Sequence, residues 1–151
     1  MSDRGAAAAE PKVWTFFYGS YMNPAVLAET GIRPDRFVVA RLPGYDIRIE
    51  PRANVVAAPG RQVFGVLAES THGELGRLYA HAQDVLGETY LPHPVLVETD
   101  EGPRPALCYI CPSMAPRTPE RAYVDRILAP ARQFGFPAEY IARLESFRPR
   151  A

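Results

Sequence analysis

The passage from Phe17 to Pro24 holds the residues whose types and spacing point most directly to chemistry. Gly19 interrupts a run of aromatic and β-branched residues, and Asn23-Pro24 then supplies an N-cap and a first helical residue. A glycine turn between a strand and a helix N-terminus directs several backbone N–H groups, and the positive end of the helix dipole, toward one place beyond the strand. This arrangement predicts binding of a carboxylate or stabilisation of an oxyanion, and the alternative is an ordinary strand-to-helix turn. Ser20 does not lie in a G-x-S-x-G elbow, so it is not interpreted as a nucleophile.

Few other polar side chains have a spacing that suggests a site. Arg52 and Asn54 follow a predicted strand, and an arginine there can clamp a substrate carboxylate through two hydrogen bonds. A surface arginine without such a role is the simpler interpretation. The three histidines share no ligand spacing on a common face, so no metal site is predicted. They are His72, His81 and His93.

The two cysteines, Cys108 and Cys111, lie in an apolar run that predicts a strand. Residues three apart in a strand point to opposite faces, so these thiols are predicted neither to form a disulfide nor to share a metal. A free cysteine usually behaves as a small core residue. We therefore expect two buried thiols.

The composition predicts one domain with a hydrophobic core. The chain has 151 residues, of which 47% are apolar, and its 17 Lys and Arg balance 17 Asp and Glu. This content excludes global disorder, and a balanced charge without Lys/Arg runs argues against a nucleic-acid partner. No apolar stretch reaches the roughly 18 residues of a membrane span, and residues 1–12 lack the pattern of a signal or transit peptide. We expect a cytoplasmic protein that does not bind membranes, with a disordered tail over residues 1–12.

The pattern of apolar residues predicts strands in the first two thirds of the chain, with helices that do not alternate strictly with them. Strands are predicted over residues 13–18, 37–42, 45–50, 63–68, 90–99 and 105–111. The second and third form a hairpin with Pro43-Gly44 as its turn, and residues 52–60 form an irregular loop. Helices are predicted over residues 24–29 and 70–86, and two more follow Thr118. This order predicts an α+β fold with a closed or nearly closed mixed sheet flanked by helices.

The helix over residues 70–86 has the strongest signals in the chain. Thr71 and Glu74 have capping-box spacing, and Gly87 ends the helix. One apolar stripe follows its face, formed by Leu75, Leu78, Tyr79, Ala82, Val85 and Leu86.

The segment Tyr18-Gly19-Ser20 is similar to the Y-G-S-N loop of the gamma-glutamylcyclotransferase-like, or AIG2-like, superfamily. The similarity continues through most of the chain. The matching segments are residues 40–45, similar to the family's A-x-L-x-x-aromatic segment, residues 63–67, similar to its V-x-G-x-aliphatic strand, and Tyr90, Val95, Val97 and Tyr109 in its later strands. The resemblance implies a small mixed β-barrel flanked by helices, with a cavity at one end, in a single domain over residues 13–151.

The resemblance also implies an activity. Enzymes of this superfamily release 5-oxoproline from gamma-glutamyl amines or peptides, because the free α-amine of the gamma-glutamyl group attacks its own γ-carbonyl. Such a ring closure has a high effective molarity once the substrate is held folded. The implied partner is a small molecule with a gamma-glutamyl-like group, no metal or organic cofactor is implied, and the protein is expected to be a monomer or a homodimer.

By the same resemblance, the backbone of Tyr18, Gly19, Ser20 and Tyr21 supplies hydrogen-bond donors to the substrate. Tyr21 stands where the family usually has Asn, so this chain departs from the pattern at one side-chain contact. The predicted set of substrate-binding residues is completed by Met22, Arg52, Asn54, Tyr90 and Tyr109.

The proton-transferring acid of the family is a Glu in a pattern like L-D-x-x-E-G. Alignment on Leu78 puts Ala82 at that position, and alignment on Tyr90 puts Gln83 there. The nearest acids are Asp84, which is predicted to face water opposite the apolar stripe, and Glu88, which follows the helix and is preferred as the hypothetical base.

Three alternatives stay open. The acid comes from elsewhere, such as Glu50 or Glu69; the protein binds a small molecule or a partner without catalysis; or the shifted acid serves another amide cleavage.

Overall fold

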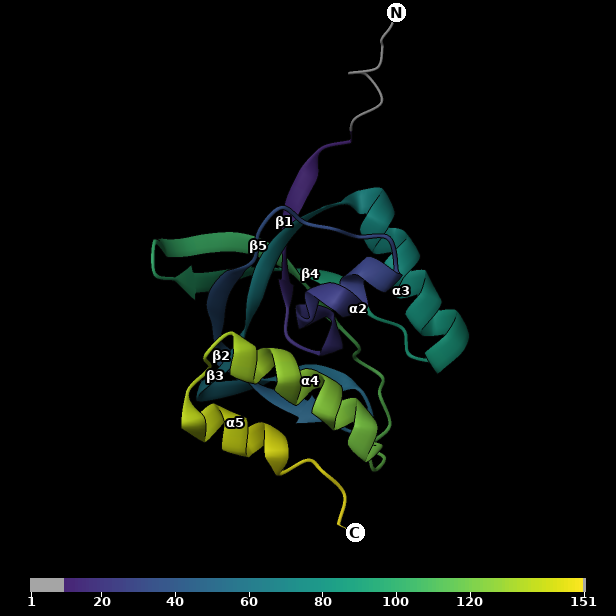
Figure 1. The fold of residues 1–151 in the computed structure, drawn as a ribbon, viewed down its shortest axis with the longest axis vertical. Helices are drawn as coiled ribbons and strands as arrows, with labels where there is room; N and C mark the ends of the chain where they lie inside the picture. Colours follow the sequence, from purple (N-terminus) through teal and green to yellow (C-terminus); the bar gives the residue numbers. More distant parts are fainter. Residues whose placement is uncertain (1–9, 151) are drawn as a thin grey trace, which may run out of the picture.

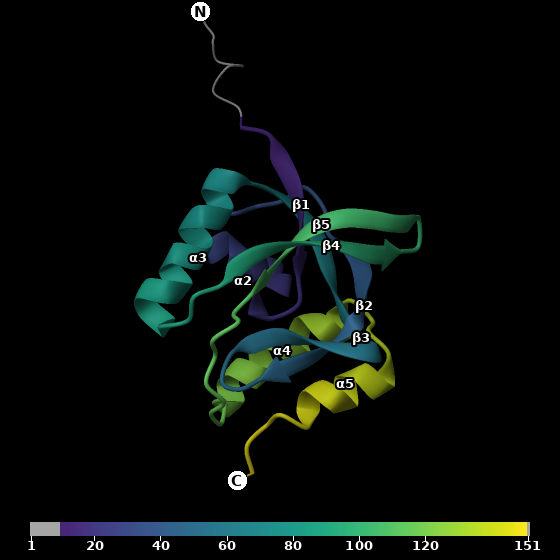
Figure 2. The same ribbon diagram turned by 180° about the vertical axis from the view of Figure 1, so that it is seen from behind.

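A computed structural model describes residues 10–150, which form five strands closed into a barrel (Figures 1 and 2). The strands are β1 Lys12–Phe17, β2 Val38–Ile49, β3 Ala53–Thr71, β4 Leu91–Thr99 and β5 Gly102–Ile110. Their order around the barrel is β1-β3-β2-β4-β5. Neighbours are antiparallel except β1 and β5, which are parallel where Thr15 pairs with Leu107. The predicted α+β class with a small mixed barrel is confirmed.

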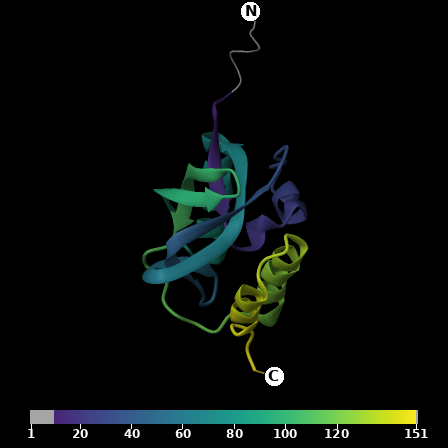
Figure 3. The ribbon, with the colours of Figure 1, turned by 90° about the vertical axis from the view of Figure 1, so that its left-hand side faces the viewer.

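Helices flank the barrel at its side and at one end. They are the short η1 Ser20–Met22, and α2 Pro24–Glu29, α3 His72–Leu86, α4 Arg121–Gln133 and α5 Ala138–Glu145. The helices α2 and α3 lie on one side, opposite the projecting tip of the β4–β5 hairpin (Figures 1 and 2). The helices α4 and α5 pack next to each other at the end of the barrel farthest from the start of β1 (Figure 3). Among residues 10–150, no helix is both long enough and apolar enough to cross a bilayer.

The predicted hairpin over residues 37–50 is wrong. The chain runs through Pro43-Gly44 as one strand, β2, which pairs with β3 along its whole length. Pro43 pairs with Gln62 but Tyr45 pairs with Ala57, so residues 58–61 bulge from β3 at the level of Gly44. Gly44 has a φ of 85°, a conformation that favours glycine. The antiparallel pair of β2 and β3, called the β2–β3 ribbon below, bends here without ending.

The predicted irregular loop over residues 52–60 is therefore wrong as well, because most of it belongs to β3. Ala53 and Val55 are buried and pair with Ile49 and Ile47 of β2. The real turn between the two strands lies at residues 50–52. This turn lies against the loop after β1, next to the candidate site.

The helix α3 ends as predicted and has the predicted capping box, but it begins at His72 rather than at Ser70, because Ser70 and Thr71 belong to β3. The Thr71 side chain accepts the Glu74 N–H, and the Glu74 carboxylate accepts the Thr71 N–H. Gly87 caps the C-terminus in the left-handed conformation, with a φ of 76°. Leu75, Leu78 and Ala82 are buried against the barrel, whereas the side chains of Val85 and Leu86 lie outside what the structure describes.

The remaining predicted elements differ mainly at their ends. The tail is predicted to include Lys12, but Lys12 begins β1 and pairs with Thr71 of β3; residues 1–9 of the predicted tail lie outside the described residues. Cys108 and Cys111 are free and buried, as predicted. Burial raises the pKa of the Cys108 thiol to about 12, so it remains protonated at neutral pH.

Candidate functional site

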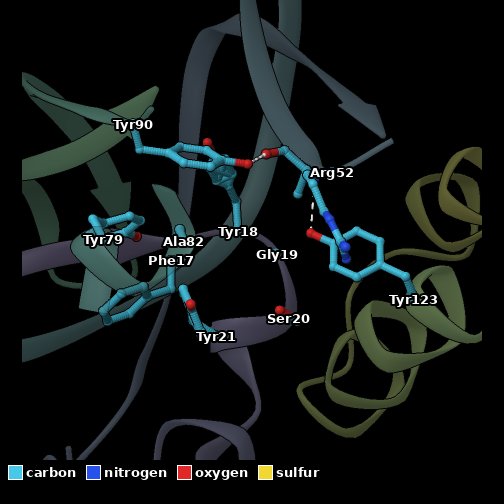
Figure 4. A pocket seen from close by; sticks show the side chains of 11 residues that line it. Phe17, Tyr18, Gly19, Ser20, Tyr21, Arg52, Tyr79, Ala82, Tyr90 and Tyr123 are labelled. Carbon is cyan, nitrogen blue, oxygen red and sulfur yellow. Dashed lines mark hydrogen bonds between the residues drawn. The ribbon is translucent and has the colours of Figure 1, made fainter. Parts of the chain in front are cut away.

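A pocket opens where the turn after β1 meets α3, the β2–β3 turn and α4 (Figure 4). Its cavity volume is about 60 Å³, and the empty space reaches about 500 Å³ when the part open to solvent is included. Six of its residues are aromatic. The lining consists of Phe17, Tyr18, Gly19, Ser20, Tyr21, Arg52, Ala53, Tyr79, Ala82, Tyr90 and Tyr123.

Gly19 is required by the close approach of two backbone segments. Its φ of −117° is open to any residue, but a Cβ at this position would lie only 2.8 Å from the Cβ of Ala53. The absence of a side chain therefore lets the turn after β1 pack against the β2–β3 turn. These two turns form adjacent walls of the pocket.

The turn after β1 continues directly into two short helices. The N–H groups of Met22 and Asn23 donate to the carbonyl oxygens of Gly19 and Ser20, at 3.0 and 3.1 Å. The first N–H groups of such a turn have no acceptor within it, so those of Ser20 and Tyr21 can serve a ligand. The Asn23 side chain accepts the Ala25 N–H at 2.9 Å, which confirms the predicted N-cap of α2.

Three tyrosine hydroxyls hold the walls of the pocket together. Tyr18 donates to the carbonyl oxygen of Tyr109 at 2.5 Å, and Tyr90 donates to that of Ala53 at 2.6 Å. The hydroxyl of Tyr123, on α4, accepts the Ala53 N–H at 2.9 Å. Both polar groups of the Ala53 backbone are thus fixed from opposite sides of the pocket (Figure 4).

The pocket tyrosines are neutral groups. Burial raises the pKa of Tyr18, Tyr21, Tyr79, Tyr90 and Tyr123. Their phenols therefore stay protonated at neutral pH and serve as hydrogen-bond partners and as aromatic surface.

Arg52 supplies the charge of the pocket. Its guanidinium carbon lies 4.8 Å from the centre of the Tyr123 ring, so the ring supports the cation over one face. Among the residues that the structure describes, Arg52 is the only ionised side chain in the lining. A guanidinium beside unpaired backbone N–H groups is suited to a carboxylate.

The structure brings together six of the predicted substrate-binding residues and leaves three outside the lining. Those in the lining are Tyr18, Gly19, Ser20, Tyr21, Arg52 and Tyr90. Met22 is fully buried, and its N–H bonds to the Gly19 carbonyl oxygen. Asn54 is buried and pairs with the backbone of Cys111, donating to the carbonyl oxygen and accepting the N–H. Tyr109 stacks on Tyr79 at 3.9 Å and so supports the wall from behind.

The two acids considered as bases do not line the pocket either. Asp84 is exposed to water. Glu88 is half-buried, and its Oε2 atom is buried with no hydrogen-bond partner among residues 10–150. Ala82, the residue that alignment on Leu78 matched to the family's Glu, does line the pocket.

Phe17, Tyr79 and Tyr123 line the pocket but are not among the predicted substrate-binding residues. Phe17 and Tyr79 belong to the apolar pattern of a strand and a helix, a pattern that by itself predicts burial rather than a site. Tyr123 comes from α4, and no local signal connects that helix to the turn after β1. Its contact depends on the bend of the β2–β3 ribbon.

A sequence model of one protein family matches residues 15–127, and its description is gamma-glutamyl cyclotransferase, AIG2-like. The chain belongs to this family. The match begins within β1 and extends through the other four strands into α4, so it includes every segment that lines the pocket. The resemblance noted in the sequence is thereby confirmed at the level of the family.

Solved structures similar to this AIG2-like chain share its fold. A human protein described as uncharacterized protein loc79017 has 23% identity and a TM-score of 0.81, over 93% of this chain and 90% of that one. A structure described as gamma-glutamyl cyclotransferase has 23% identity and a TM-score of 0.74, with the same coverage. A yeast gamma-glutamyl cyclotransferase specific to glutathione has 12% identity and a TM-score of 0.60, over 91% of this chain and 97% of that one. The comparison with curated protein sequences gives no significant match.

Proposed function

We propose that the pocket binds a small molecule with a gamma-glutamyl-like group and that the protein releases 5-oxoproline from it. One observation carries this proposal. The turn Gly19-Ser20-Tyr21 and the Arg52 guanidinium, which lie far apart in the sequence, line one pocket in a chain of the gamma-glutamyl cyclotransferase family. This combination suits a ligand with a carboxylate and an adjacent amide carbonyl.

The chain's groups fit the steps of this reaction. Arg52 binds the α-carboxylate of the gamma-glutamyl group, which orients the neighbouring α-amine toward the γ-carbonyl carbon. The N–H groups of Ser20 and Tyr21 stabilise the oxyanion that forms on the carbonyl oxygen. The new C–N bond closes the five-membered ring, the bond to the leaving amine breaks, and the leaving nitrogen takes up a proton.

We propose Glu88 as the base that accepts the proton of the α-ammonium and returns it to the leaving amine. It lies two residues before Tyr90, which lines the pocket; burial raises the pKa of the Tyr90 phenol, and the charge of Glu88 adds a smaller part. A carboxylate oxygen that is buried without a partner has a free acceptor site for a hydrogen bond from a ligand. Asp84 is the alternative, at an exposed position on α3.

A second candidate function is ligand binding without catalysis. The observation that favours it is the lining itself, which among the described residues contains no Asp or Glu and has Ala82 at the wall formed by α3. A protein of this kind retains the carboxylate-binding turn and Arg52 but lacks proton transfer.

The test is 5-oxoproline release from a panel of gamma-glutamyl amines and peptides, with the wild type beside Glu88→Gln and Asp84→Asn. We expect turnover by the wild type and loss of about 100-fold or more in Glu88→Gln, because general base catalysis contributes about 10² to 10⁴ in rate. Loss in Asp84→Asn alone would move the role of base to Asp84. Binding without release from any substrate would favour the second candidate.

A further inference from the structure

The pocket has two chemically different ends. Arg52 and the Tyr123 ring form the polar end, where the guanidinium carbon lies 4.8 Å from the centre of the ring. Rings of Phe17, Tyr21 and Tyr79 form the other end, with centroid distances of 6.3 Å between the first two and 6.0 Å between the last two. Figure 4 shows these two groups on opposite sides of the pocket, with Ala82 beside the ring group. We call Phe17, Tyr21, Tyr79 and Ala82 the apolar end.

Apart from the phenol oxygens of Tyr21 and Tyr79, the apolar end presents carbon to the pocket (Figure 4). The hydroxyls of Tyr18 and Tyr90 both donate to backbone carbonyl oxygens, so they are already engaged. The Tyr90 ring lies 5.6 Å from that of Tyr79 and extends the aromatic surface toward Ala53. Ala82 adds only a methyl group at a position where a longer side chain would fill the space.

The two ends also differ in charge, because Arg52 lies at the polar end and the apolar end has no ionised side chain among the described lining residues. A cationic substituent at the apolar end would meet no carboxylate of the described lining, which includes no Asp or Glu, and Glu88, the proposed base, lies outside that lining. A leaving group with its own carboxylate would place that charge among aromatic rings, away from Arg52. Removing either charge from water without a partner is costly, whereas burying an aromatic or branched aliphatic group is favourable.

We propose that the amine released from the substrate carries an apolar, preferably aromatic, substituent that occupies the apolar end. This inference rests on the proposed function, because it assumes that the gamma-glutamyl carboxylate binds Arg52. The preferred substrate is then a gamma-glutamyl conjugate of an arylalkylamine, and conjugates of amino acids or diamines are poor ligands.

The test uses glutaric acid monoamides, which keep the carboxylate and the amide of a gamma-glutamyl amine but lack the α-amine and cannot cyclise. Calorimetry on the full chain compares the benzyl, methyl, carboxymethyl and 5-aminopentyl amides. We expect the benzyl amide to bind about tenfold or more tightly than the other three, from the apolar area that the ring buries.

Two substitutions test whether the apolar end causes the preference for the benzyl amide. Ala82→Leu fills the apolar end and should reduce the benzyl-to-methyl affinity ratio to about threefold or less, and Tyr21→Ala should reduce it by removing one ring. Ala80→Leu is the matched control, because Ala80 is exposed on the same helix, and should keep the wild-type ratio.

Equal binding of all four amides, or the same ratio in Ala82→Leu as in the wild type, would overturn this inference and leave the proposed function standing. Binding of none of the amides, together with no 5-oxoproline release from any gamma-glutamyl compound, would overturn both.

Discussion

The Tyr90 hydroxyl donates a 2.6 Å hydrogen bond to the carbonyl oxygen of Ala53, and this bond joins the start of β4 to the turn between β2 and β3. Ala53 also packs against Gly19 and donates its N–H to Tyr123. The walls of the pocket therefore meet at one small residue. The geometry of the site depends on contacts among segments that are distant in the sequence.

Tyr90→Phe should weaken this junction. The substitution keeps the ring but leaves the Ala53 carbonyl oxygen without its partner, so the free energy of unfolding should fall by about 1 to 2 kcal/mol. Urea denaturation measures this change. Tyr45→Phe, at a position outside the pocket lining, is the control. Unchanged stability in Tyr90→Phe would contradict the role given to the bond.

Gly19→Ala and Gly76→Ala should have opposite effects on stability. A Cβ at Gly19 would lie 2.8 Å from the Ala53 Cβ, so the substitution should cost about 1 to 3 kcal/mol and separate the two turns. Gly76 lies in α3 with nothing within 4 Å of a Cβ, so alanine there should stabilise the protein by about 0.5 to 1 kcal/mol. Thermal denaturation of both variants tests the contrast, and equal effects would refute it.

Asp46 and the two arginines that bind it, Arg48 and Arg143, should make the stability of the fold sensitive to acid. Burial opposes ionisation of Asp46, but hydrogen bonds from Arg48 and Arg143 outweigh it and lower the pKa of this carboxyl. A lowered folded-state pKa gives stability that is present above the unfolded-state value of about 3.9 and is lost as the pH falls through the folded-state pKa.

We therefore expect the contribution of Asp46 to stability to be constant above about pH 5 and to decline below about pH 4. Asp46→Asn should be less stable than the wild type at neutral pH, and this difference should shrink at low pH. Urea unfolding at a series of pH values measures both. A difference that is independent of pH would show that the carboxylate charge is not what the arginines stabilise.

A carboxylate at position 82 should restore proton transfer where Glu88 has been neutralised. Ala82 lines the pocket, so Ala82→Glu in the Glu88→Gln background places an acid within the site. We expect 5-oxoproline release to recover at least tenfold over Glu88→Gln alone, as a fraction of the usual contribution of a general base. Ala80→Glu in the same background, on the exposed face of α3, should give no recovery. Recovery in both would show that position in the pocket is irrelevant.

Local sequence signals predicted the elements that depend on local interactions. The capping box of Thr71 and Glu74 and the left-handed conformation of Gly87 are set within one turn of α3, and both are present. The turn after β1 was likewise evident from Gly19 and Asn23. These features require no knowledge of distant contacts.

The β2–β3 ribbon could not be predicted in the same way. Pro43-Gly44 is a turn signal in isolation. In the fold, pairing with β3 on both sides of Gly44 keeps β2 continuous, and the two strands bend there together. Asn54 looked like a polar loop residue, yet pairing with the Cys111 backbone buries it. Tyr123 reaches the pocket only because this ribbon and α4 pack together, a contact that follows from the tertiary fold alone.

The most direct test of the central claim is calorimetric binding of glutaric acid monobenzylamide to the wild type and to Arg52→Gln, with Arg77→Gln on the exposed face of α3 as control. A hydrogen bond to a charged group contributes about 1.5 to 3 kcal/mol, so Arg52→Gln should bind about 10 to 100 times more weakly, and Arg77→Gln should bind like the wild type. Equal affinity of the wild type and Arg52→Gln would contradict the claim that Arg52 holds the carboxylate of a gamma-glutamyl group in this pocket.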